Sequence, residues 1–143
     1  MEKKTGFSLQ KLLDVRHLGE KEKQKELSQS KRELKTEEEN LLKLEVKRDQ
    51  VAQKMQSIER AEVSRIMNHH TYLSSVLESI VRKRTEIEDT EQKVEEKRQR
   101  LLTATKDRKA LEKLKEKHTL EQRITAKKTE QAFLDEIALR KGL

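Results

Sequence analysis

The four histidines are the side chains of this sequence best suited to bind a metal or move a proton. His69 and His70 are adjacent, so on a helix they point about 100° apart and cannot bind one ion as residues four apart do. His17 and His118 have no obvious ligand partners. We therefore expect exposed helix histidines, no metal site and no cofactor.

Other constellations that carry chemistry are also missing from the sequence. The chain has no Cys, which excludes thiol catalysis and Cys-ligated zinc, and its three Gly at positions 6, 19 and 142 form no phosphate-binding loop. The adjacent carboxylates Glu37, Glu38 and Glu39 are typical of a solvated helix face. We predict no catalytic residues, and hence a protein that is not an enzyme.

The composition predicts long helices and a thin core. Of the 143 residues, 43% are charged and only 31% are hydrophobic, and there is no Pro. A compact domain usually has about 45–50% apolar and about 25% charged residues. The N-terminus is charged and no apolar run approaches the roughly 18 residues of a membrane span. These features argue against an enclosed substrate pocket and favour a soluble or peripheral protein.

Apolar residues recur at the seven-residue spacing of a coiled coil. Such spacing places them on one stripe of a helix, which is buried against a partner stripe. The first series is Leu27, Leu34, Leu41, Leu44, Val51, Met55 and Ile58. The second is Ile66, Leu73, Ile80, Ile87, Val94 and Leu101, and Leu120, Ile124, Leu134 and Ala138 resume it after a phase slip.

The partner stripe is expected within the same chain. Residues 68–71 are poor helix formers, and an acidic block at 33–45 would face a basic block at 97–118 if the chain reversed near residue 73. Because no Gly or Pro marks the turn, its predicted range is Ser57 to Ser75. We predict an all-α fold in a single domain, residues 1–143: an antiparallel two-helix coiled-coil hairpin. Its helices would span about 7–58 and 86–140, with a helical tip at about 59–85. A parallel dimer of unbroken helices is the rival.

A net charge of +7 makes nucleic acid the natural alternative partner. The basic block at 97–118 contains no aromatic residue to stack on bases, and the acidic block is available to face it. We therefore expect no nucleic-acid binding. A basic coiled coil that binds nucleic acid, or a generic coiled-coil scaffold, stays as the alternative function.

Four segments, taken in order, resemble the FliJ family of bacterial flagellar export proteins. They are Phe7–Arg16 with Glu20, Tyr72-Leu73 with Leu77, Leu111–Leu114 with Glu116-Lys117, and Leu134–Ala138. The resemblance implies a two-helix antiparallel coiled coil similar to the gamma stalk of rotary ATPases. It also implies a non-enzymatic component of type III export that binds the hexameric ATPase FliI and the gate protein FlhA. Export chaperones would be further partners, and the chain would work at the cytoplasmic face of the inner membrane.

The resemblance also implies two binding sites. The paired termini would insert into the ATPase ring through Leu9, Leu12, Leu13, Arg16, Leu134, Ile137 and Arg140. In the hairpin the first four would lie beside Leu134, Ile137 and Ala138, and the alternative is that these residues only close the coiled coil. A mid-chain stripe would touch FlhA through Tyr72, Val76, Ser79 and Lys83. These four are spaced along one helix face beside the seam, so we expect that face to be partly exposed. The alternative is that Tyr72 and Val76 pack over the end of the thin core.

Overall fold

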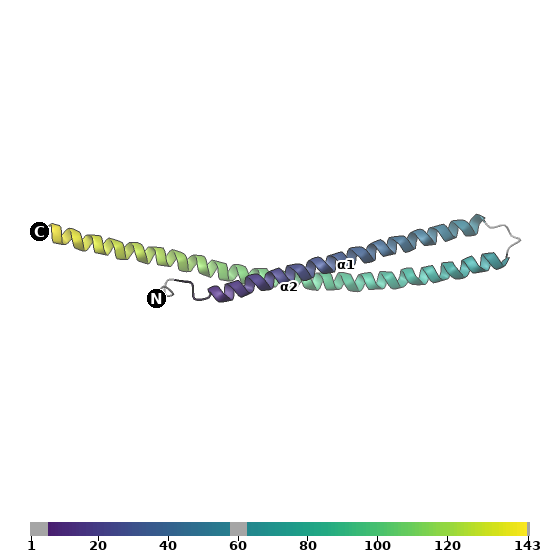
Figure 1. Cartoon of the computed structure of the whole chain (residues 1–143), viewed down its shortest axis with the longest axis horizontal. Coiled ribbons are helices and arrows are strands. Elements are labelled where there is room, and N and C mark those ends of the chain that lie inside the picture. Colours follow the sequence, from purple (N-terminus) through teal and green to yellow (C-terminus); the bar gives the residue numbers. More distant parts are fainter. Residues whose placement is uncertain (1–5, 58–62, 143) are drawn as a thin grey trace. The chain divides into compact units, whose positions relative to one another are not determined.

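The computed structural model describes residues 6–57 and 63–142, and these form two long helices packed against each other. Helix α1 spans Gln10–Ser57 and helix α2 spans Val63–Lys141 (Figure 1). No strand occurs in the part of the chain that the structure describes. The predicted all-α fold with two packed helices is confirmed.

The helix bounds show that the predicted tip at about 59–85 is wrong over most of its length. Helix α2 begins at Val63 rather than near residue 86, and it runs without interruption through residues 68–71. Intrinsic propensity is a weak prior that packing overrides, and no Pro is present to stop the helix. The rest of the predicted tip, residues 59–62, and the predicted seam residue Ile58 lie outside the described residues. Helix α1 begins three residues later than expected and ends one earlier.

The chain divides into two compact units. The first, which we call the turn unit, is Gln24–Gln99; the second, the terminal unit, combines Met1–Lys23 with Arg100–Leu143.

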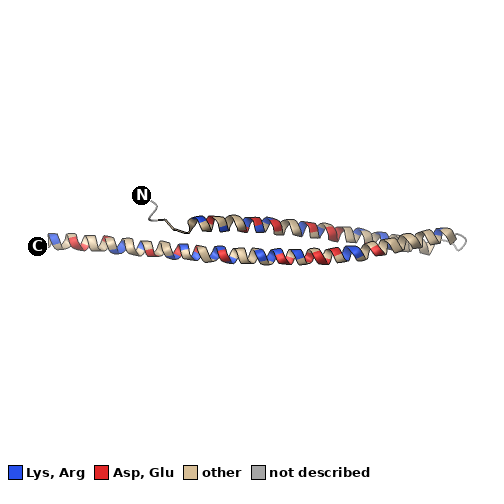
Figure 2. Cartoon of the chain, turned by 90° about the horizontal axis from the view of Figure 1, so that it is seen from below, with Lys and Arg blue, Asp and Glu red and all other residues tan. Residues whose placement is uncertain are grey.

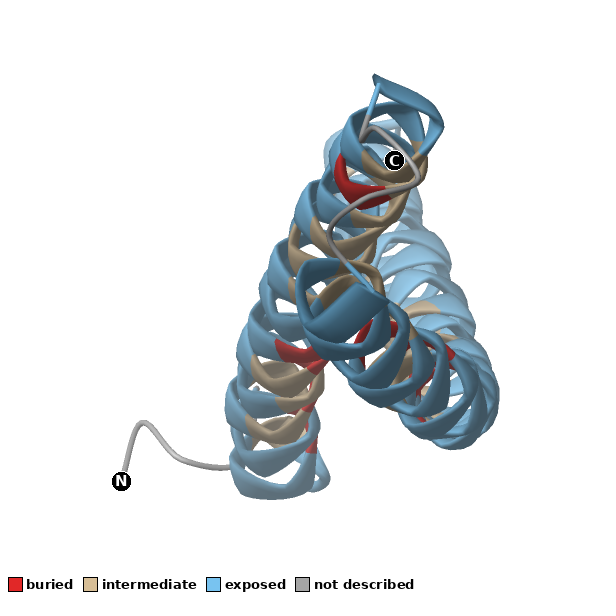
Figure 3. Cartoon of the chain, turned by 90° about the vertical axis from the view of Figure 1, so that its right-hand side faces the viewer, coloured by how far each residue is buried: buried red, intermediate tan, exposed pale blue. Residues whose placement is uncertain are grey.

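In the turn unit the two helices run antiparallel around a narrow apolar seam. Contacts join Ser30 to Lys97, Glu37 to Thr90 and Glu45 to Arg84, so numbers rise on α1 as they fall on α2. The predicted seam is confirmed by burial, and Figure 3 shows how few residues are buried (red). The buried apolar side chains of this unit are Leu27, Val51, Val76, Ile80, Ile87 and Val94.

These contacts show that the predicted charge-block pairing is wrong. The acidic block at 33–45 lies against Arg84 and Thr90 rather than against the basic block. Helix α1 ends at Ser57 and the antiparallel helix α2 begins at Val63, so the reversal lies at the start of the predicted range Ser57 to Ser75 and not near residue 73. The reason is energetic: burying one Leu or Ile contributes about 1.5–3 kcal/mol, whereas an exposed ion pair contributes about 0–1 kcal/mol. The apolar seam decides the register.

In the terminal unit α2 continues beyond the start of α1. The ring of Phe7, just before α1, packs on His118 with centroids 5.7 Å apart. Residues 119–141, which we call the C-terminal arm, follow this contact and are exposed except for half-buried Gln122 and Ile137. At about 1.5 Å per residue the arm is roughly 34 Å long.

The last part of the predicted seam, which falls on the C-terminal arm, is wrong. Residues Leu120, Ile124, Leu134 and Ala138 were expected in the core, and all four are exposed. Their spacing is that of a coiled coil, but α1 begins at Gln10 and so offers them no facing helix.

Candidate interaction surfaces

The histidines lie on the helices, but only His70 is exposed as predicted, while His17, His69 and His118 are half-buried. His17 Nε2 lies 3.3 Å from Glu112 Oε1, and the ring of His118 packs against that of Phe7 at an interplanar angle of 52°. Across the described ranges 6–57 and 63–142, no three His, Asp or Glu side chains gather in a way that could hold a metal ion.

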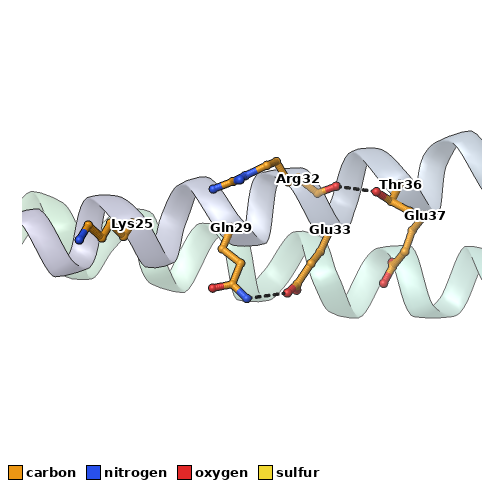
Figure 4. Close-up of a pocket in the computed structure, with 6 residues that line it drawn as sticks. All are labelled: Lys25, Gln29, Arg32, Glu33, Thr36 and Glu37. Atoms are coloured by element: carbon orange, nitrogen blue, oxygen red, sulfur yellow. Dashed lines mark hydrogen bonds between the residues drawn. The ribbon is translucent and has the colours of Figure 1, made fainter.

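The grooves on the helices are open surface features. The one in Figure 4 is lined by six α1 residues of the turn unit: Lys25, Gln29, Arg32, Glu33, Thr36 and Glu37. Its polar groups hydrogen-bond along their own helix, Gln29 to Glu33 at 3.4 Å and Thr36 to the Arg32 carbonyl at 3.0 Å. A groove whose lining comes from one helix does not enclose a substrate.

A polar cluster replaces apolar residues in the core of the terminal unit. The Glu20 carboxylate accepts hydrogen bonds from Arg108 Nε and from Thr105 Oγ1, the latter at 3.0 Å. Arg108 Nη1 also donates to Glu112 at 2.8 Å. Burial alone would raise the pKa of Glu20, but the hydrogen bonds from Arg108 and Thr105 together lower it below its ordinary value. The hydrogen bonds that Arg108 donates, first to Glu20 and second to Glu112, raise the pKa of Arg108.

The α1 side of the predicted ATPase-binding site is partly exposed. Leu9 and Leu12 are 39% and 40% exposed, and Arg16 lies 4.0 Å from Asp107 across the two helices. Leu13 is different, because it is 3% exposed and belongs to the core. The exposed members of this group can reach a partner; Leu13 holds α1 in place.

The α2 side of that predicted site lies on the C-terminal arm. Leu134 is exposed, Ile137 is half-buried, and exposed Arg140 pairs with Glu136 of its own helix at 2.9 Å. The expectation that these residues lie beside Leu9 to Arg16 is wrong, since Arg16 faces Asp107. The terminal unit therefore presents two separate surfaces. The C-terminal arm extends past α1 because of the register between the helices, which the predicted pairing of charge blocks gave wrongly.

The predicted gate-binding stripe is divided between core and surface. Tyr72 is 49% exposed, while Val76 is 5% exposed and packs in the seam. Ser79 and Lys83 are half-buried, and Lys83 Nζ donates to Glu86 at 2.7 Å, which raises the pKa of Lys83. The predicted partial exposure holds for Tyr72 and is wrong for Val76. Val76 follows Leu73 by three residues, which makes it the second seam position of the heptad.

Four exposed apolar residues lie outside both predicted sites, and the sequence assigned none of them to a binding surface. Leu77 and Val81 lie four apart and line a shallow groove of the turn unit with Glu78 and Arg82. Phe133 and Leu139 stand exposed on the arm. In the sequence each of the four is an apolar residue at a position outside the heptad seam. Single apolar residues are common on protein surfaces, so this feature does not by itself identify a binding residue.

The net charge belongs entirely to the terminal unit. Its sequence contains 18 Lys and Arg against 11 Asp and Glu, for +7, whereas the turn unit contains 16 of each. The basic block at 97–118 thus lacks the acidic partner expected for it. The acidic block at 33–45 therefore does not neutralise the basic block.

The fold defines a class of protein, a two-helix coiled coil whose second helix continues past the start of the first. The family model for the flagellar FliJ protein matches residues 5–142. The chain therefore belongs to the FliJ family and is a component of flagellar protein export. No curated protein and no solved structure matches it. Over the described ranges, neither helix has a stretch long and apolar enough to cross a membrane.

Proposed function

We propose that the chain is a non-enzymatic coupling component of the flagellar export apparatus. In this proposal it binds the hexameric export ATPase FliI and the gate protein FlhA, and it takes part in the recycling of export chaperones. It works as a peripheral protein at the cytoplasmic face of the inner membrane. The observation that carries the proposal is the family match over residues 5–142, and the long two-helix construction supports a stalk.

The terminal unit is the ATPase-facing end in this proposal. Its C-terminal arm supplies a helix of about 34 Å with exposed Leu134 and Arg140, a shape suited to insertion into a ring. Exposed Leu9, Leu12 and Arg16 form a second contact, beside the point where α1 begins. Because the two surfaces are separate, each has its own test.

The test of the arm is a chain that ends at His118. It should keep its thermal melting temperature, because the arm residues have no facing α1 helix, and it should lose stimulation of ATP hydrolysis by FliI. The matched control is the full chain with Leu12→Ala and Arg16→Ala. Its stimulation of ATP hydrolysis tests the α1 surface alone. Full stimulation by the shortened chain would remove the arm from the proposed contact.

The gate contact is proposed through Tyr72, with Val76 as its support from the core. Tyr72→Ala should weaken FlhA binding while the melting temperature stays nearly unchanged, because half of the tyrosine is already exposed. Val76→Ala should lower the melting temperature, because the buried side chain leaves a cavity in the seam. Unchanged FlhA binding by the Tyr72 variant would place the gate contact elsewhere.

A further inference from the structure

One face of α2 in the terminal unit is a row of lysines. All six are exposed, and among the residues that the structure describes none of them forms an ion pair. The members of this lysine row are Lys106, Lys109, Lys113, Lys117, Lys127 and Lys128. Figure 2 shows Lys and Arg (blue) recurring along this part of α2.

The row lies opposite the face with which α2 packs on α1. From Lys106 the next three members follow at steps of three, four and four, which keeps them on one side of a helix. The half-buried residues of the same stretch lie on the opposite side of the helix. They include Leu101, Ala104, Arg108 and Leu111. Packing on α1 therefore leaves the row outward. From Lys106 to Lys128 it extends about 33 Å.

We propose that the lysine row is a docking surface for an anionic lipid bilayer. Every member is Lys rather than Arg, and Lys acts as a hydrated point charge that suits a fluid anionic surface, whereas Arg is favoured for fixed bidentate pairs. Exposed Leu120 and Ile124 continue the same face. An acidic protein surface is less favoured, because the row offers no aromatic or Arg anchor.

The terminal unit supplies the long-range attraction for this docking. Its +7 charge is not offset by the neutral turn unit, so the chain would approach an anionic membrane with its terminal unit first. The inference does not depend on contacts with FliI or FlhA. It adds a surface by which the chain itself would reach the bilayer.

The experiment is cosedimentation of the full chain with vesicles of phosphatidylcholine containing about 30% phosphatidylglycerol. Each Lys near such a surface contributes roughly fivefold to binding. The variant Lys106→Gln, Lys113→Gln and Lys117→Gln should therefore bind roughly 100-fold more weakly. A matched control removes three exposed lysines of the turn unit, Lys31→Gln, Lys35→Gln and Lys47→Gln, and should keep most of the binding.

Other outcomes would overturn the proposal. Equal losses in the two variants would show a general charge effect, and failure to bind the anionic vesicles at low salt would remove the bilayer as the ligand. Binding to duplex DNA without binding to vesicles would assign the row to nucleic acid. If the row variant bound vesicles normally but no longer stimulated FliI, the row would belong to the ATPase contact. Loss of vesicle binding with stimulation intact is the result expected here.

Discussion

Replacement of Glu20 by Ala should destabilise the paired helices of the terminal unit. The Glu20 side chain is 11% exposed, and it accepts hydrogen bonds from both Arg108 and Thr105 across the seam. A hydrogen bond to a charged group contributes about 1.5–3 kcal/mol to the free energy of unfolding. The bond from the neutral Thr105 hydroxyl contributes no more than this. Because Glu112 still pairs with Arg108, the arginine is not left alone, which limits the loss. We expect the free energy of unfolding to fall by about 2–3 kcal/mol.

Chemical denaturation followed by circular dichroism measures this loss, and a paired variant supplies the control. Glu20→Leu combined with Arg108→Leu replaces both partners by apolar side chains at a seam position, so stability should return to near the wild-type value. A fall below about 0.5 kcal/mol for Glu20→Ala would refute the reasoning, because it would place the cluster among exposed ion pairs of little value.

The pH dependence follows from the same carboxylate. The pKa of Glu20 is lower in the folded chain than in the unfolded chain, so its contribution is complete above the unfolded value and is lost as pH falls through the folded one. The wild-type chain should therefore lose more stability than Glu20→Gln on acidification below about pH 5. Parallel pH profiles for the two proteins would contradict this assignment.

Three further predictions concern the helices themselves. Gly19→Ala should raise the free energy of unfolding by about 0.5–1 kcal/mol in denaturation, because an added methyl group meets no atom within 4 Å; a loss would contradict the open space there. Ile80→Ala should lower it by about 2–4 kcal/mol, because Ile80 is 2% exposed; a loss under about 1 kcal/mol would mean the seam is loose. Cysteines at Glu37 and Thr90, in a chain that has none, should cross-link within one monomer, as non-reducing electrophoresis would show; links only between chains would favour the parallel dimer.

Much of the fold could be predicted from the sequence because apolar spacing is a local signal. The seven-residue repeats place Leu27, Ile80 and Ile87 on a seam, and these side chains are buried. The absence of Pro and the abundance of good helix formers predict the helices. Both features can be read along a single segment without knowledge of what faces it.

The register could not be predicted in the same way, because it depends on which residues face each other. Matching blocks of charge placed the reversal near residue 73, yet Glu37 pairs with Thr90 and Glu20 with Arg108. With this register, helix α2 continues past the start of α1 at Gln10, so the C-terminal arm does not face α1. The predicted two-sided ATPase site and the predicted neutralisation of the basic block both depended on the wrong register.

Secretion of flagellar proteins by a strain that lacks the gene for this chain tests the central claim most directly. The full chain should restore secretion, because it supplies both the paired helices and the arm. The chain that ends at His118 should be produced at a similar level and should fail to restore it. Full restoration by the shortened chain, or normal secretion without any form of the chain, would contradict the proposed coupling role.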